Sequence, residues 1–428
     1  MSEVNSGALP LAFGAIADDI TGASDLANTL VRGGMPTVLA IGVPEMEVAD
    51  TEAVVIALKT RTIPVEEAVS QSMAAHRWLA ARQTGTLMVK YCSTFDSTEK
   101  GNIGPVVDAV LDASGMRLSV VCPAFPANKR TVYKGRLFVG DVPLDESSMR
   151  DHPLTPMRDA SLVRLMGRQT PHAVGLVPWE TVAQGSAALS DAFDRLMAEG
   201  VRHAVVDALT DQDLVAIAQG AQGRALLTGG SGIATGIPAI CGAADSSGKA
   251  GAQAFPRVDG PALIVAGSCS AATNAQVAAF KADGGLCYRV DPLTLADDLE
   301  ALGAASAWVR QNLGERPILV YSTTDPERLR QVQARLGVER AAELVENALS
   351  QIASQAVEAG VRRVVVAGGE TSGAVMNALR IRLLRIGPEI DPGVPWTATL
   401  GEKPIVLALK SGNFGGPDFF TRSLEVLP

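Results

Sequence analysis

The stretch RRVVVAGGETSGAVMNAL, residues 362–379, decides the fold prediction, because a run of β-branched residues ends at a glycine pair just before a helical pattern begins. A strand followed at once by a helix is the repeating step of parallel α/β sheets. Glycine lets the backbone approach a ligand, and the first N–H groups of the helix attract anions. The stretch therefore predicts a βα turn that binds phosphate, although a tight turn without a ligand explains one such pair equally well.

Two further strand-like runs end in the same way. They are IVAGSCSAATNAQV (264–277) and LALKSGNFGGPD (407–418). The carboxyl ends of parallel strands meet at one edge of a sheet, where ligands bind. Three Gly/Ser endings in one domain favour phosphate binding over three unrelated turns. The sequence contains neither the P-loop motif nor the dinucleotide fingerprint, so these spacings alone leave the ligand open.

The whole chain predicts two α/β domains, each a mainly parallel sheet flanked by helices. Strand-like and helix-like stretches alternate on both sides of the segment GAADSSGKAGAQAFPRVDGP (242–261), which is small, polar and typical of a linker. We expect an N-terminal domain over 1–245, a linker over 246–261 and a C-terminal domain over 262–428. Residues 126–160 are polar and lack a helical period, which predicts a long loop.

Composition excludes several classes of protein. The 428 residues are 47% hydrophobic and 19% charged, which is typical of a globular chain. A net charge of −9 argues against nucleic acid or an anionic membrane as a partner. Five cysteines without CxxC spacing and four separate histidines predict neither a disulfide framework nor a zinc site. No signal peptide or spanning segment is recognisable, so a cytoplasmic protein is expected.

A pair of carboxylates follows the first strand-like run. Asp18 and Asp19 precede Thr21 and Gly22, where a helix is expected to start. Such a pair can accept a proton from a hydroxyl, bind sugar hydroxyls or hold Mg²⁺, whereas an aspartate that merely caps the helix needs no chemistry. Neighbours on an extended strand end point to opposite sides, so we expect one aspartate to face a substrate and the other to cap the helix.

Basic and polar side chains follow other strands of the first half. A parallel sheet gathers them at the same edge as the aspartates, where they suit an anionic, hydroxylated small molecule, although scattered basic residues are more often surface charges. The residues concerned are Arg61, Lys90, Asp96, Ser97, Asn128 and Lys129.

Seven stretches resemble the four-carbon acid sugar kinase family in one order. They are ADDITGASD, KYCSTFDSTEKGNIGPV, CPAFPANKRTVYKG, LTGGSGIA, AGSCSAATNAQ, AGGETSGAV and LKSGNFGGPDFF, and they span residues from about 14 to 420. The second of them is similar to the 3-oxo-tetronate kinase branch. Threonate and erythronate kinases of the family more often carry K-x-D-S-T-x-R-G-N at this place, and the extra Phe95 departs from that form.

The resemblance implies an enzyme that uses ATP and Mg²⁺ to phosphorylate the 4-hydroxyl of 3-oxo-tetronate in a cleft between the two domains. For such a reaction we favour Asp18 and Asp19 as the catalytic pair over Asp96, because they follow a strand directly, whereas Asp96 lies deeper in a loop. We expect acid-sugar contacts from the other first-domain residues named above, Thr21 and Gly22 among them. Metal ligands stay unassigned. Nucleotide contacts are expected from Ser268, Ser270, Gly368, Gly369, Glu370, Thr371, Ser411 and Gly412.

Three alternatives stay open at this point. The first is a threonate or erythronate 4-kinase, and the second is a non-catalytic acid-sugar sensor, which would need only one ligand site. The third is an NAD-dependent dehydrogenase, although the dinucleotide fingerprint is missing. The expected partners are the acid sugar and ATP, and the sequence leaves a homo-oligomer open.

Overall fold

The computed structural model describes residues 10–45, 48, 51–152, 154–242, 255–298 and 300–427. The chain divides into two compact units, Met1–Ala252 and Gln253–Pro428. Part of the predicted linker, residues 246–254, lies outside the described residues. The predicted domain boundaries stay predictions.

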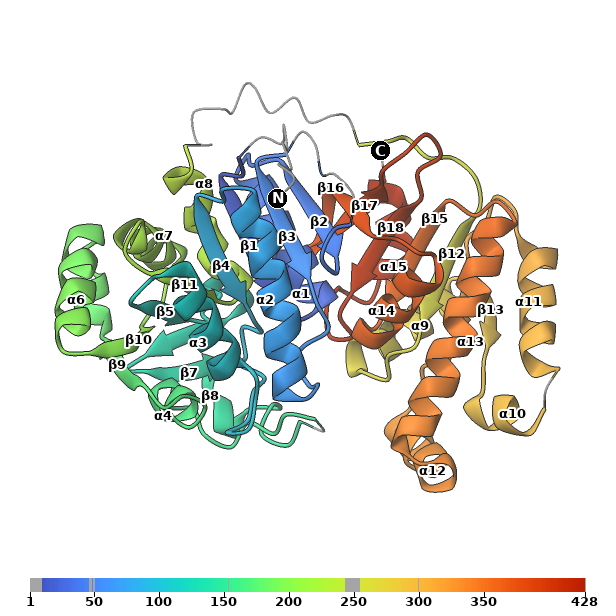
Figure 1. Ribbon diagram of the computed structural model, residues 1–428. Coiled ribbons are helices and arrows are strands. Elements are labelled where there is room, and N and C mark those ends of the chain that lie inside the picture. The colour runs from blue at the N-terminus through green and yellow to red at the C-terminus, as the bar shows by residue number, and fades with distance from the viewer. Residues whose placement is uncertain are drawn as a thin grey trace. The chain divides into compact units, whose positions relative to one another are not determined.

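The first unit is built on a parallel sheet with the strand order β2-β3-β1-β4-β11-β5-β10-β9 (Figure 1). Every neighbouring pair within this order is parallel. β1 is buried along its whole length, as its unbroken apolar sequence requires. The strands are β1 (Phe13–Ala17), β2 (Thr37–Ile41), β3 (Ala53–Ala57), β4 (Thr86–Lys90), β5 (Ser119–Cys122), β9 (Ala173–Val177), β10 (Val201–Val206) and β11 (Leu226–Gly229).

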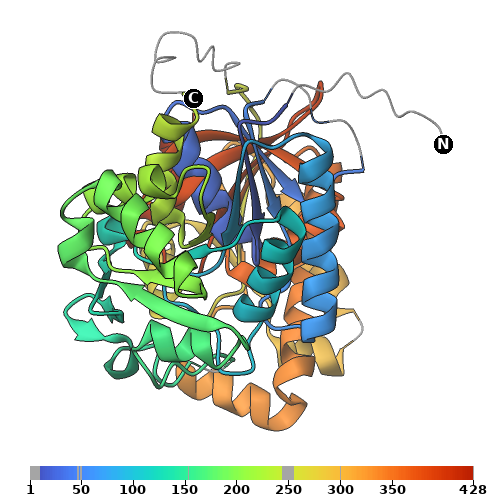
Figure 2. The ribbon, with the colours of Figure 1, turned by 60° about the vertical axis from the view of Figure 1, so that its left-hand side comes forward.

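Helices cover both faces of this sheet. Figure 2 shows α2 and α3 together on one face and α1, α6 and α7 on the other. The helices of this unit are α1 (Ile20–Arg32), α2 (Val65–Ala81), α3 (Ile103–Ser114), α4 (Leu162–Gly167), α5 (Trp179–Val182), α6 (Ser186–Ala198), α7 (Asp211–Ala221) and α8 (Ile237–Ile240). Short 3₁₀ turns lie at η1 (Pro126–Asn128), η2 (Leu144–Glu146) and η3 (Ser231–Gly236).

The segment 126–160 differs from the predicted long loop. It contains a small antiparallel sheet of β6 (Arg130–Tyr133), β7 (Arg136–Val139) and β8 (Val142–Pro143). Asp207 fixes the turn between β6 and β7, because its carboxylate accepts hydrogen bonds from the backbone N–H groups of Lys134 (2.7 Å) and Gly135 (2.8 Å). A partner more than 70 residues away stabilises this turn, so local sequence gives little sign of it.

The second unit contains a mixed sheet in the order β13-β14-β12-β15-β18-β17-β16. The five strands from β13 to β18 are parallel, and β17 pairs antiparallel with both β18 and β16. The strands are β12 (Ala262–Ala266), β13 (Leu286–Arg289), β14 (Ile318–Tyr321), β15 (Arg363–Ala367), β16 (Leu383–Asp391), β17 (Val394–Thr399) and β18 (Val406–Lys410). Two units, each with a mainly parallel sheet flanked by helices, confirm the predicted fold class.

Helices and one aromatic cluster enclose the second sheet. Trp396 of β17 is fully buried beside Phe419 and Phe420, and its indole N–H donates to the carbonyl of Ser423 at 2.8 Å. That bond satisfies the polar atom of a large buried ring. The helices are α9 (Ala271–Ala282), α10 (Pro292–Asp297), α11 (Ala301–Asn312), α12 (Pro326–Leu336), α13 (Val338–Glu358), α14 (Gly369–Ala378) and α15 (Phe419–Val426).

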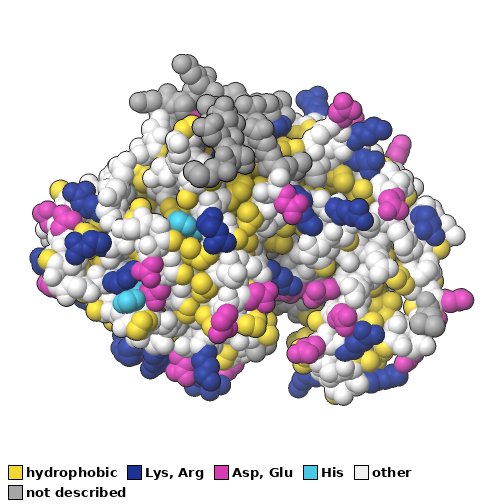
Figure 3. All heavy atoms as spheres, viewed as in Figure 1, with side chains coloured by type: hydrophobic (Ala, Val, Ile, Leu, Met, Phe, Trp, Pro, Cys, Tyr) yellow, Lys and Arg dark blue, Asp and Glu magenta, His cyan; other side chains and the backbone are white. Residues whose placement is uncertain are grey.

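The described surface mixes charges of both signs. Figure 3 shows lysine and arginine side chains interspersed with aspartate and glutamate on the face drawn. The net charge of −9 is therefore not gathered into one acidic patch on the described part of that face. Among the described helices, none has both the length and the apolar character needed to span a bilayer.

Candidate active site

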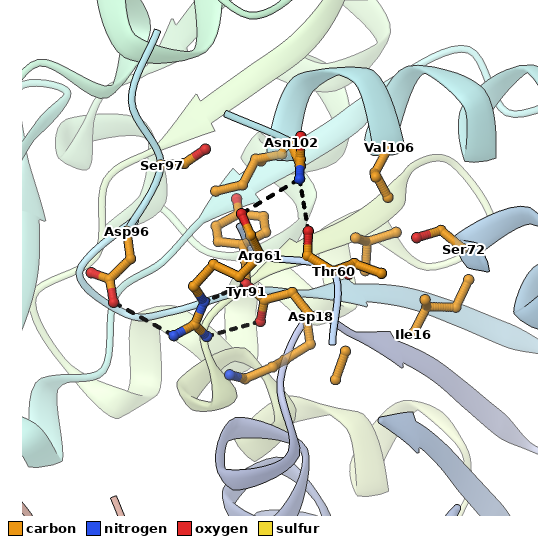
Figure 4. A pocket seen from close by; sticks show the side chains of 14 residues that line it. Ile16, Asp18, Thr60, Arg61, Ser72, Tyr91, Asp96, Ser97, Asn102 and Val106 are labelled. Carbon is orange, nitrogen blue, oxygen red and sulfur yellow. Dashed lines mark hydrogen bonds and ion pairs between the residues drawn. The ribbon is translucent and has the colours of Figure 1, made fainter. Parts of the chain in front are cut away.

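Arg61 contacts three carboxylates in the first unit, and Figure 4 shows two of them, Asp18 and Asp96. Its Nε and Nη2 donate to the two oxygens of Asp18 at 2.8 and 3.0 Å. Nη2 is also 2.8 Å from Asp19 Oδ1, and Nη1 is 3.6 Å from Asp96 Oδ2. The paired contact with Asp18 is the bidentate geometry that a guanidinium forms with one carboxylate. The predicted residues Asp18, Asp19, Arg61 and Asp96 thus lie together.

The parallel sheet places these groups, because they all follow the carboxyl ends of adjacent strands. Asp18 directly follows β1, and its backbone is held on both sides: its N–H donates to the carbonyl of Lys90 (3.1 Å), and its carbonyl accepts from Thr60 (3.0 Å). Asn102 fixes the segment that carries Arg61, since its Nδ2 donates to the carbonyls of Thr60 (2.7 Å) and Ile63 (2.9 Å). The position of Arg61 therefore depends on Asn102.

The two adjacent aspartates differ in their environments. Burial raises the pKa of Asp18, and the neighbouring Arg61 offsets this rise only in part. Burial acts in the same direction on Asp19, but Arg61, Lys90 and the hydroxyl of Thr21 together outweigh it and lower the pKa of Asp19. Two carboxylates with opposite pKa shifts are suited to different tasks.

Asp19 is the N-cap of α1. Its Oδ1 accepts from the N–H of Gly22 at 3.2 Å, and its Oδ2 accepts from the hydroxyl of Thr21 at 2.7 Å. The buried Lys90, at the end of β4, brings its Nζ to 3.6 Å from Asp19 Oδ1. A Cβ on Gly22 would lie 1.8 Å from that Nζ. Glycine at this position therefore makes room for the lysine.

A small cavity of about 30 Å³ lies beside this cluster. Five of the predicted site residues line it: Asp18, Arg61, Lys90, Asp96 and Ser97. Asp19 does not line it. Thr60, Tyr91 and Asn102 also line it, although they were not predicted as site residues. Asn102 stands in the quoted stretch KYCSTFDSTEKGNIGPV, so the motif itself was the available signal for it.

Four predicted substrate contacts do not line this cavity: Thr21 and Gly22 in the first turn of α1, and Asn128 and Lys129. Asn128 belongs to the turn η1, and the exposed Lys129 ends that turn in the left-handed conformation, with φ +56°. The role of these four residues in substrate binding stays a prediction.

In the second unit, hydrogen bonds converge on the carbonyl oxygen of Gly412. Ser270 Oγ donates to it at 2.6 Å, Thr273 Oγ1 at 2.9 Å and Lys410 Nζ at 3.0 Å. Ser268 Oγ accepts from the N–H of Ser270 at 3.2 Å. These contacts join the endings of β12 and β18, as the three Gly/Ser motifs predict. Lys410 and Thr273 were not predicted.

A larger cavity of about 310 Å³ lies at these strand ends. Ligand sites usually have volumes of roughly 300–1,000 Å³, so this cavity is at the lower end of that range. Predicted nucleotide contacts that line it are Ser268, Gly368, Gly369, Glu370 and Thr371. Ser270, Ser411 and Gly412 do not line it. Residues of α12 and α13, which were not predicted, form much of the remaining wall.

Two adjacent glycines shape the polar end of this cavity. Gly368 has φ +133° and a Cβ there would lie 3.2 Å from the N–H nitrogen of Ser268, so both conformation and space require glycine. A Cβ on Gly369 would meet no atom within 4 Å and would enter open space. Gly369 begins α14, whose first N–H groups have no partner within the helix. This end therefore fits the phosphates of a nucleotide.

The described residues contain no group of three or more His, Cys, Asp or Glu side chains placed to hold a metal ion. Mg²⁺ in phosphoryl-transfer enzymes is usually bound by one or two carboxylates together with substrate phosphates and waters. A magnesium ion that arrives with the nucleotide needs no such cluster.

Two family models match the chain. One is described as a sugar-binding N-terminal domain and covers residues 13–237, and the other is described as a nucleotide-binding C-terminal domain and covers residues 263–420. The Arg61 cavity lies within the first match and the larger cavity within the second.

Proteins named 3-oxo-tetronate kinase are similar to this chain over nearly its full length. The protein of Burkholderia multivorans is 52% identical over 417 residues, with 97% of each chain covered. That of Cupriavidus necator is 51% identical over 420 residues, again with 97% of each chain covered. That of Haemophilus influenzae is 42% identical over 410 residues, which cover 95% of this chain and 98% of its own.

Crystal structures of two bacterial proteins have the same fold. A Salmonella typhimurium LT2 protein superposes with a TM-score of 0.87 at 42% identity, with 97% of this chain and 99% of that chain covered. The Haemophilus influenzae protein HI1011 superposes with a TM-score of 0.79 at 41% identity, with 97% of this chain and its own full length covered.

Proposed function

The chain belongs to the four-carbon acid sugar kinase family, and we propose that it transfers the γ-phosphoryl group of ATP to the 4-hydroxyl of 3-oxo-tetronate. The resemblance drawn from the sequence motifs is thereby confirmed. The relatives named 3-oxo-tetronate kinase, at up to 52% identity, support this substrate over threonate or erythronate.

One observation supports the kinase assignment most directly. Each unit has its own cavity at the carboxyl ends of parallel strands, and the two cavities differ in chemistry. The lining of the first includes charged side chains that can bind an anionic, hydroxylated acid, and the lining of the second includes, at one side, glycine and hydroxyl groups that can bind phosphates. A sensor for one acid sugar would need only the first. A cleft that joins the two sites stays a prediction.

We assign Asp18 the role of aligning the 4-hydroxyl and accepting its proton. Asp18 lines the cavity, and its raised pKa makes it a better proton acceptor than an ordinary aspartate. Asp19 stays ionised, caps α1 and holds both Arg61 and Lys90. Mg²⁺ bound with the nucleotide would neutralise phosphate charge, which is the main demand of a loose phosphoryl-transfer transition state.

The acid sugar requires more room than the cavity of about 30 Å³ beside Arg61. A volume of that size holds about one or two waters. Three carboxylates already surround the guanidinium, so an entering carboxylate would compete with them for Arg61. We therefore propose that substrate binding displaces at least one carboxylate from Arg61 and that Lys90 pairs with the substrate's carboxylate.

A coupled assay of ADP release tests this function. With ATP and Mg²⁺, the protein should turn over 3-oxo-tetronate faster than threonate or erythronate. Faster turnover of either of those acids would transfer the assignment to that acid. Tight binding of the acids without ADP release would favour the sensor, and a change in nicotinamide absorbance would favour a dehydrogenase. Fractionation of cells would test the predicted cytoplasmic location.

A further inference from the structure

The larger cavity of the second unit has two chemically different sides. Its polar side consists of the strand endings described above, from Gly267–Cys269 and Gly368–Thr371. Its other side is formed by α12 and α13 and is mainly apolar. The apolar residues there are Leu329, Val332, Val338, Ala341, Ala342 and Val345. Phosphates need only the polar side, so the apolar side requires another explanation.

The spacing of these residues shows that two helices turn apolar faces toward the same space. Leu329 and Val332 are three residues apart on α12, and Ala341 and Val345 are four residues apart on α13, so each pair shares one face of its helix. Gly337, with φ +81°, separates the two helices. Figure 1 shows α12 at the lower end of α13.

This apolar wall is not fully covered by the protein. Val338 is 60% exposed, Ala342 is exposed, and Leu329 and Val345 are only partly buried. Folding alone gives no reason to keep several apolar groups together at the mouth of a cavity, because exposing them forgoes the stabilisation that burial supplies. Apolar pockets with a few convergent polar groups are instead typical of small-molecule sites.

The charged and amide side chains near the wall are Arg289, Asp291, Arg328, Gln333 and Glu346. Arg328 Nη2 donates to Asp291 Oδ2 at 2.9 Å, and Arg289 Nη2 donates to Thr324 Oγ1 at 3.3 Å. Gln333 of α12 also lines the cavity and can supply an amide group. A flat ring with hydrogen-bonding groups only at its edges matches this combination of an apolar wall and a few polar groups.

We infer that the wall formed by α12 and α13 binds the base of the nucleotide, while the strand endings at Ser268 and Gly368–Thr371 bind its phosphates. The inference rests on the proposed kinase function, because it assigns the two ends of one nucleotide to the two sides of one cavity. A volume of about 310 Å³ accommodates a base together with part of the remaining nucleotide. Residues 329–345 therefore determine affinity for the base.

The test uses a substitution on the wall that leaves the fold intact. Ala342→Gln adds length and an amide at an exposed helical position that lines the cavity. Ala334→Gln is the matched control, because Ala334 is exposed on α12 and does not line the cavity. Val338→Ser is a second variant, which removes apolar surface without adding bulk. Kd is measured by calorimetry for three probes: ATP, adenosine and inorganic tripolyphosphate.

We expect Ala342→Gln to raise the Kd of ATP and adenosine about tenfold or more, since a buried amide without a partner opposes binding of the base. Val338→Ser should act in the same direction with a smaller effect. Tripolyphosphate should bind all variants within about twofold of the parent protein, and Ala334→Gln should bind all three probes like the parent.

Two results would overturn the inference while leaving the kinase assignment in place. The first is unchanged ATP and adenosine binding in Ala342→Gln, which would put the base elsewhere. The second is an equal loss of tripolyphosphate binding, which would show that the helices shape the phosphate end. Failure of the parent protein to bind both ATP and tripolyphosphate would instead overturn the proposed function and this inference with it.

Discussion

Asp18 and Arg61 form a bidentate ion pair across 43 residues of sequence, with Nε and Nη2 at 2.8 and 3.0 Å from the two carboxylate oxygens. Arg61 contacts Asp19 as well, yet only Asp18 lines the cavity. The same guanidinium thus binds one carboxylate that faces the cavity and one that caps a helix. This difference predicts that the two aspartates respond differently to substitution.

Asp18→Asn should lower kcat by about 10²-fold or more, the range typical of a positioned acid–base group. Asp19→Asn should keep the helix cap, since asparagine is also a good N-cap residue, and should act mainly on stability. Steady-state kinetics with thermal unfolding of both variants measures the difference. Small, similar losses in both variants beside an inactive Asp96→Asn would transfer the catalytic role to Asp96.

The acid limb of the pH–rate profile provides a second test of whether Asp18 is the catalytic base. A base must be ionised to act, and the raised pKa of Asp18 means that ionisation is completed only at a pH above that of an ordinary aspartate, 3.8. The rate should therefore fall with decreasing pH while most other aspartates are still ionised. The residual activity of Asp18→Asn should lack this acid limb. If the limb persists in the variant, the ionisation behind it belongs to another group.

Lys90→Met should raise the KM for the acid sugar about tenfold or more and leave ATP binding unchanged, because a carboxylate without a cationic partner is costly to bury. Lys90 is buried at the end of β4, 3.6 Å from Asp19. Lys100→Met is the matched control, since Lys100 is exposed. Steady-state kinetics and calorimetry with ATP separate the two effects. Unchanged kinetics in Lys90→Met would remove this residue from the site.

Gly369→Val should weaken ATP binding about tenfold or more without unfolding the protein. The new side chain would enter open space at the polar side of the larger cavity, where the backbone is proposed to approach phosphate. Gly303→Val provides the control, because a Cβ there also meets no atom within 4 Å and Gly303 lies in α11, away from the cavity. Calorimetry with ATP gives both values. Parent-like binding by a folded Gly369→Val would contradict the phosphate placement.

Much of the fold could be predicted because buried parallel strands carry nearly continuous apolar runs. All of the strand-like runs quoted around residues 264, 364 and 407 are strands in the structure. No strand is predicted between residues 370 and 403, yet β16 and β17 form an antiparallel hairpin there. The short strand β11 is likewise buried in the middle of its sheet, where the hydroxyl of Thr228 donates to the carbonyl of Val120. Partners distant in sequence determine both elements.

The site could be predicted only as far as strand endings reveal it. Asp18 and Gly368 follow strands directly, Lys90 is the last residue of β4, and one edge of each sheet gathers such residues. The ion pair between Arg61 and Asp18 could not be predicted, because the two residues are 43 positions apart and form no local motif. The apolar wall of α12 and α13 was missed for a different reason, because apolar residues at helical spacing are as typical of an ordinary core as of a ligand site.

Lys410 supplies a further prediction, since it is a fully buried lysine at the end of β18. Burial lowers its pKa to about 7, from an ordinary value of 10.5. Its Nζ donates to the carbonyl oxygens of Ser411 and Gly412, both at 3.0 Å, and to Thr273 Oγ1 at 3.1 Å. The lysine therefore connects the ending of β18 to the first turn of α9, beside the proposed phosphate site.

The lowered pKa fixes the sign of a pH effect on stability. Between about pH 7 and 10.5 the unfolded chain keeps a proton on Lys410 that the folded chain has released. The unfolded state then binds more protons, so the contribution of Lys410 to stability rises with pH, by up to about 1.4 kcal/mol per pH unit. Below pH 7 both states are protonated, and this contribution stays constant at its lowest value.

Comparison with Lys410→Met isolates this effect, because the other titrating groups occur in both proteins. The difference in the free energy of unfolding between parent and variant should shift in favour of the parent as the pH rises from about 7 toward 10. Urea unfolding of the full chain at a series of pH values measures it, followed at the transition of the second unit. Lys410→Arg, which stays charged throughout, should show no such shift relative to Lys410→Met. A difference that is independent of pH would mean that Lys410 keeps an ordinary pKa and stays charged in the folded protein, with the hydrogen bonds to Ser411, Gly412 and Thr273 compensating for its burial.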